Sequence, residues 1–258
     1  MSFFNRMLAS IGIGNAKVDT RLATSQLTPG ALVEGTVHIE GGNVEQQIDT
    51  IYLHLMTQYI RESNDHKVTE TATIAKFKVA QGFTLNPQEK RDIPFTFTLP
   101  LETPLTLGRT PVWIRTGLDV QSAVDPTDND HVEVVPQANV KTVLEAMTDL
   151  GFMLRAAKNE YNRRYQGRLP FVQEFEYYPS GAYRGKLDEI DLIFFPSENG
   201  VEVVIEVDRK ARGLASFLEE AMDMDERKQK VYFTNQELAQ GTSAVGRKLE
   251  EIIRLHAN

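Results

Sequence analysis

The chain has 258 residues and a formal net charge of −8, and it contains no cysteine. The lack of cysteine excludes disulfides, thiolate nucleophiles and cysteine-ligated metal sites, and it favours a reducing compartment such as the cytoplasm. Neither half carries the basic stripe that nucleic-acid binding requires, and neither contains a run of about 20 apolar residues able to cross a bilayer, so we expect a soluble cytoplasmic protein.

The length exceeds the usual size of a single domain, about 100–150 residues, so two domains are expected. We place an N-terminal amphipathic helix at residues 1–14, a first β-sandwich at 15–136, a second at 137–238 and a C-terminal helix at 239–258. The boundary between the sandwiches rests on the sequence Pro136-Gln137-Ala138-Asn139, which is typical of a linker.

The first residues have apolar side chains at helical spacing, and the pattern stops at Gly12 and Gly14. The apolar positions are Phe3, Phe4, Met7, Leu8 and Ile11. Such a helix docks on its own protein, in a groove of a partner protein or on a membrane surface.

Beyond this helix, apolar and polar residues alternate with a period of two, which predicts strands with one buried and one wet face. The predicted strands of the first half lie near residues 33–40, 47–61, 93–99 and 112–118. Turn residues separate them, and almost no helical pattern intervenes. This arrangement is typical of an antiparallel sandwich.

In the second half, residues 143–150 have helical composition, while residues 152–161 fit a helix or a strand. The two-residue period then returns, and it predicts strands near residues 171–177, 190–194, 201–207 and 231–233. Within this domain, apolar residues near 214–223 recur at helical spacing, so we expect an inserted helix that packs across the sheet.

Residues 242–256 place apolar side chains on one helical face and charged side chains on the other. This helix either closes an interface or sheet edge of its own protein or serves as a detachable recognition segment. Our candidate partner-contact residues on the two terminal helices are Phe3, Phe4, Met7, Leu8, Leu249, Ile252 and Ile253.

No residues have the spacing of a known reactive site. The acidic segment Asp125–Asp130 lacks the glycine and glutamate positions of an EF-hand, and the acids near Asp188–Asp191 suit the wet face of a sheet. The segment Asp208–Gly213 fits either a solvated turn or a site for an acidic motif. We therefore expect no catalytic residue, no metal, no cofactor and no enzymatic activity.

Three stretches, residues 169–176, 183–189 and 207–209, resemble the bacterial sporulation-control protein family. The Phe3-Phe4 opening and the loop at residues 124–128 extend the resemblance over essentially the whole chain. The resemblance implies an all-β, arrestin-like pair of antiparallel sandwiches with short helices. It also implies a regulatory role in sporulation, as a scaffold that binds other proteins.

Arrestin-type proteins bind partners along sheet faces and at the domain junction, where a polar cluster holds the two domains. Arg115 and Asp119 are our candidates for such a cluster. Exposed sheet edges also allow a homodimer. The alternative is a peripheral membrane or lipid-binding adaptor that uses the N-terminal helix, although Arg6 is the only basic side chain there to attract anionic lipid.

Overall fold

The computed structural model describes residues 16–63, 66–108, 110–120, 125–165, 167, 169–209 and 228–257. Contacts divide the chain into two compact units. Unit 1 comprises the described residues up to Gln58, with Glu70–Thr106 and Pro111–Val135. Unit 2 comprises Tyr59–Thr69, Leu107–Thr110 and the described residues from Pro136 onward. The segments Tyr59–Thr69 and Leu107–Thr110 thus belong to unit 2, although they lie in the first half of the sequence.

The predicted helices at 1–14 and near 214–223 lie outside the described residues. The same holds for four candidate partner-contact residues, Phe3, Phe4, Met7 and Leu8.

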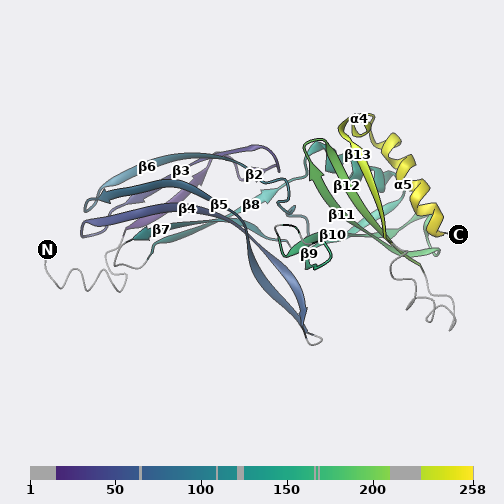
Figure 1. Cartoon of the computed structure of the whole chain (residues 1–258), viewed down its shortest axis with the longest axis horizontal. Coiled ribbons are helices and arrows are strands. Elements are labelled where there is room, and N and C mark those ends of the chain that lie inside the picture. Colours follow the sequence, from purple (N-terminus) through teal and green to yellow (C-terminus); the bar gives the residue numbers. More distant parts are fainter. Residues whose placement is uncertain are drawn as a thin grey trace. The chain divides into compact units, whose positions relative to one another are not determined.

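Unit 1 is a sandwich of two sheets (Figure 1). One sheet has the order β1-β3-β6, with β1 Lys17–Leu22, β3 Leu32–Glu40 and β6 Lys90–Thr98. The other consists of β5 His66–Leu85, β4 Gln46–Ser63, β7 Val112–Val120, β8 Thr127–Val134 and β2 Gln26–Leu27, in that spatial order. The pairing of β2 with β8 is parallel, while β4, β7 and β8 pair antiparallel.

The core of unit 1 lies between the two sheets and is made by the alternating apolar positions. Ile51, Leu53 and Leu55 of β4 are fully buried, and so is Val37 of β3 on the opposite sheet. Each buried residue alternates with one that faces outward, as the two-residue period predicts. The expectation of an antiparallel, mostly β chain is confirmed.

Unit 2 contains a curled antiparallel sheet with the order β13-β12-β11-β10-β9. Its strands are β9 Phe152–Tyr161, β10 Phe171–Pro179, β11 Leu187–Ser197, β12 Gly200–Arg209 and β13 Lys228–Thr234. The end of β4 pairs in parallel with β9 through Ile60 and Glu160. The segment 152–161, which fitted helix or strand from its sequence, is a strand.

Helices cover the apolar face of this sheet (Figure 1). They are α2 Ala138–Asp149 and α5 Thr242–Ala257, with the short α4 Asn235–Leu238 and the 3-10 turn Gly181–Tyr183 nearby. Met147 of α2 and Leu249 of α5 are fully buried, as is Phe233 of β13. In the described part of unit 2, helices rather than a second sheet form the layer opposite β9–β13.

Candidate functional site

The outer face of the five-stranded sheet in unit 1 gathers aromatic and basic side chains. They come from β4, β5, β7 and β8, and we call them the aromatic–basic face: Tyr52, His54, Met56, Lys76, Trp113, Arg115 and His131. Strand register brings them together, because Met56 lies opposite Trp113, His54 opposite Arg115, and Trp113 in turn opposite His131. Their neighbours along each strand point into the core.

The side chains of this face contact one another across the strands. The Lys76 ammonium lies 3.5 Å from the centre of the Tyr52 ring, which is a cation–π contact. The Tyr52 and His54 rings are 6.2 Å apart in an edge-to-face arrangement, and the Trp113 and His131 rings are 5.9 Å apart. These side chains therefore pack against one another across the strands.

The electrostatics of the face are basic at its centre. Partial burial lowers the pKa of His54, and the positive charges of Lys76 and Arg115 lower it further. Lys76 and Arg115 are exposed, and neither has a carboxylate within ion-pair distance among the described residues. Elsewhere, Arg91 pairs with Glu89 and Lys228 with Glu206, while the exposed Lys17 and Arg247 likewise have no ion pair among the described residues.

Arg115 and Asp119, the predicted polar cluster, both lie exposed on β7. They are four residues apart on one strand, which separates them by about 13 Å, so they do not pair with each other. Arg115 belongs to the aromatic–basic face. A role for either residue at a domain junction stays a prediction.

The described candidate residues of the C-terminal helix lie in α5. Leu249 and Ile253 are fully buried within unit 2, whereas Ile252 is half-buried. The exposed apolar residue of this helix is Leu255, with 74% of its surface accessible. The contact with partner proteins stays a prediction, but Leu249 and Ile253 already serve the core of their own unit.

The sheet of unit 2 has a second polar surface on the side away from the helices. We call it the carboxylate face: Glu160, Glu174, Glu176, Glu189, Asp191 and Glu206. Cations pair with the outer members, since Lys158 bonds Glu176 and Lys228 lies 2.7 Å from Glu206. Sequence alone assigned such acids to the wet face of a sheet, but it did not predict their gathering on neighbouring strands.

The two central acids of the carboxylate face are hard to ionise. Burial, followed by repulsion from Glu189, raises the pKa of Asp191 to about 8. Burial, followed by repulsion from Glu160, raises the pKa of Glu174 to about 7. One carboxylate oxygen of Asp191 is buried without a hydrogen-bond partner. The described residues include no group of three or more that could hold a metal ion.

An open groove of about 430 Å³ lies at the end of β10 in unit 2, lined in part by Met153, Tyr178, Arg184 and Leu187. Met153 is 62% exposed, and the Arg155 guanidinium stacks 4.6 Å from the centre of the Tyr178 ring. The groove mixes apolar and charged groups of both signs, because Asp188 also lines it. It indicates no particular ligand.

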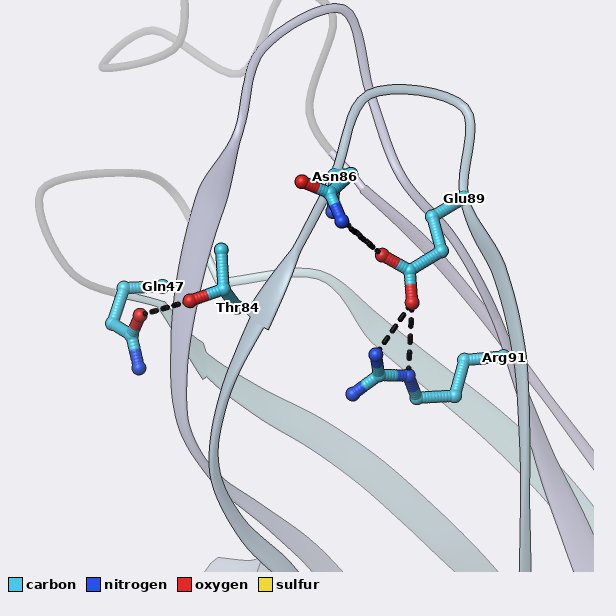
Figure 2. Close-up of polar contacts among 5 residues, drawn as sticks. All are labelled: Gln47, Thr84, Asn86, Glu89 and Arg91. Carbon is cyan, nitrogen blue, oxygen red and sulfur yellow. Dashed lines mark hydrogen bonds and ion pairs between the residues drawn. The ribbon is translucent and has the colours of Figure 1, made fainter.

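A polar cluster fixes the turn between β5 and β6 in unit 1 (Figure 2). Glu89 accepts hydrogen bonds from the backbone and side-chain amides of Asn86, both at 2.9 Å, and pairs with Arg91. The Asn86 and Arg91 donors lower the pKa of Glu89. Thr84 donates to Gln47 at 3.0 Å across to the neighbouring strand. All these groups satisfy one another, so the cluster supports the turn.

No helix in the part of the chain that the structure describes is long and apolar enough to span a bilayer.

Comparison with known proteins gives consistent matches. A family model described as SpoOM protein matches residues 4–211. The sporulation-control protein Spo0M of Bacillus subtilis is 46% identical over 258 residues, which is all of both chains. The crystal structure of Spo0M from Bacillus subtilis matches with a TM-score of 0.87 and 45% identity, covering 95% of this chain and 100% of that one.

Proposed function

Because this chain belongs to the SpoOM protein family, we propose that it is a non-enzymatic regulator of sporulation that acts by binding other proteins. The homologue carries a sporulation-control name, which supports the regulatory role. Two β-rich units are compatible with an arrestin-like scaffold, and the absence of cysteine suits the cytoplasm. The resemblance that the sequence predicted is confirmed by these matches.

The observation that carries the binding role is the aromatic–basic face. Trp, Tyr and Arg are the residues that most often dominate binding energy at protein interfaces. Here strand register places Trp113, Tyr52 and Arg115 on one face of the sheet, where Arg115 is exposed and the two aromatic rings are half-buried. No other part of the described surface combines an accessible tryptophan with basic groups, since Trp113 is the single tryptophan of the sequence.

Cross-linking in living, sporulating cells, followed by mass spectrometry, tests this function. We expect reproducible cross-links from fixed surface positions of the full chain to the same partner proteins in independent cultures. A chain that cross-links to no protein in cells whose sporulation depends on it would overturn the proposal.

A further inference from the structure

We propose that the aromatic–basic face binds an acidic segment of a partner protein, with carboxylates at Lys76 and Arg115 and an apolar side chain against Met56 and Trp113. The inference deepens the proposed function and rests on it, because it assumes that the chain works by binding proteins.

The first argument is charge complementarity. The chain has an excess of acidic residues, with a net charge of −8, and several of its cations pair with them. Lys230 lies 3.1 Å from Glu202, and Arg254 lies 2.8 Å from Glu250. Lys76 and Arg115 instead face an aromatic ring and a histidine. An incoming carboxylate would supply the missing counter-charge.

The second argument is the apolar surface beside these cations. Met56 and Trp113 lie directly opposite each other on β4 and β7, and both are half-buried. A methionine side chain adapts to varied shapes, while a tryptophan offers a large rigid surface. The pair can therefore bury one apolar side chain of a partner while the cations fix its charged neighbours.

The face also disfavours other occupants. Single-stranded nucleic acid requires a longer basic track than Lys76 and Arg115 provide, and Asp119 lies farther along the same strand. A short acidic polypeptide needs only one or two cations and an apolar contact.

Fluorescence of the full-length protein tests the proposal directly, because Trp113 is the only tryptophan and lies within the face. The probe is a short synthetic peptide of glutamates with a leucine at its centre, and the control peptide has glutamine in place of every glutamate. We expect a saturable change in emission with the glutamate peptide alone, weakened at high salt. Titration calorimetry on the same samples detects binding that leaves the emission unchanged.

Two charge reversals complete the design. Arg115→Glu should raise the dissociation constant for the glutamate peptide about tenfold, because an attraction to the peptide becomes a repulsion. Lys17→Glu on β1 is the matched control, because Lys17 is exposed on the other sheet of unit 1; it should change the constant less than about twofold. Both side chains are exposed, so both variants should fold.

Three results of the peptide experiments would overturn the proposal. They are the absence of binding in both measurements, equal binding of the glutamine peptide, and equal weakening by the two reversals. Self-association of the chain that blocks peptide binding would assign the face to a second copy, which also contradicts it. Cross-links to partners in cells that persist despite such results would leave the proposed function standing with a different contact surface.

Discussion

Asp191 and Glu174 hold their protons more tightly in the folded chain than in the unfolded one. Their folded pKa values are about 8 and about 7, whereas an unfolded carboxyl group titrates near 4, at about 3.9 for Asp and about 4.3 for Glu. Between the unfolded and the folded pKa values the folded state binds more protons than the unfolded state. The free energy of unfolding therefore decreases as the pH rises from about 4 towards 8. Neighbouring ion pairs, such as Lys228 with Glu206, offset only part of this cost.

Asp191→Asn should remove this pH dependence in part. At pH 8 we expect the free energy of unfolding to rise by about 1–2 kcal/mol, because a buried charge with an unpaired oxygen is lost, and at pH 5 we expect little change. Urea unfolding at both pH values measures the difference. Asp188→Asn, an exposed site on the same strand, is the control. If the free energy of unfolding changed equally with pH in the native chain and in Asp191→Asn, this account would be contradicted.

Glu89 has the opposite linkage. Its pKa is lowered, chiefly by the backbone amide of Asn86 and then by Arg91, so its contribution to stability is present above the unfolded pKa and is lost as the pH falls through the folded value. Glu89→Gln should lower the midpoint of thermal unfolding by a few degrees at pH 7. Glu45→Gln, at an exposed position of the same unit, should not. Equal midpoints for the two variants would show that the turn does not depend on this carboxylate.

At the scale of single elements, the sequence predicted most strands and the C-terminal helix, because their apolar residues alternate or recur without interruption. It did not predict β1, β2 and β8, nor β5, the longest of the described strands. Ile74 is buried and Phe77 stacks on Phe97 at 4.0 Å, so two inward positions are three residues apart and the alternation changes phase. Helix α4 was also missed, although Thr234 and Glu237 form a capping box that the sequence contains.

Sequence predicted the residues of the aromatic–basic face poorly for a related reason. Arg115 was chosen for its charge, but Trp113, Tyr52 and Lys76 join it only through the pairing of β5, β4 and β7. A single sequence gives no register between strands that are far apart along the chain. For β4 and β7 the alternation gives the side on which Tyr52, Trp113 and Arg115 lie, but for β5 the change of phase left Lys76 unassigned.

Helix α5 allows a matched pair of substitutions. Leu249→Ala should lower the free energy of unfolding by about 2–5 kcal/mol, since Leu249 is fully buried and its loss leaves a cavity. Leu255→Ala should change it by less than about 0.5 kcal/mol, because Leu255 is exposed. Urea unfolding measures both. A small effect of Leu249→Ala would mean that α5 is not part of the folded core. Because α5 supplies buried residues to unit 2, removing the whole helix would unfold that unit and is a poor test of partner binding.

Strand β3 approaches its neighbours closely at Gly35. A β-carbon there would lie 2.6 Å from the carbonyl oxygen of Arg21 and 2.5 Å from the ring of Phe95. Gly35→Ala should therefore destabilise unit 1 by about 1–3 kcal/mol. Gly117→Ala on β7 is the control, because nothing lies within 4 Å of the position that a β-carbon would take there. Similar thermal stability of both variants would contradict the packing described for β1, β3 and β6.

For the molecule as a whole, the chain is a member of the SpoOM protein family made mainly of strands. The buried apolar residues of the unit 1 strands form the core of a sandwich, and those of the unit 2 strands pack between a sheet and its covering helices. The aromatic–basic face, on the outer surface of unit 1, is our proposed site for a partner protein, and we propose that the regulatory role depends on contact through it.

Spore frequency in cells whose only copy of this protein is a variant tests that dependence most directly. We predict that the combined change Lys76→Glu and Arg115→Glu alters the fraction of cells that form spores as strongly as loss of the protein does, while Lys17→Glu leaves it at the native value, with equal amounts of folded protein in all strains. Native spore frequency in the double variant, or an equal defect in Lys17→Glu, would contradict the account.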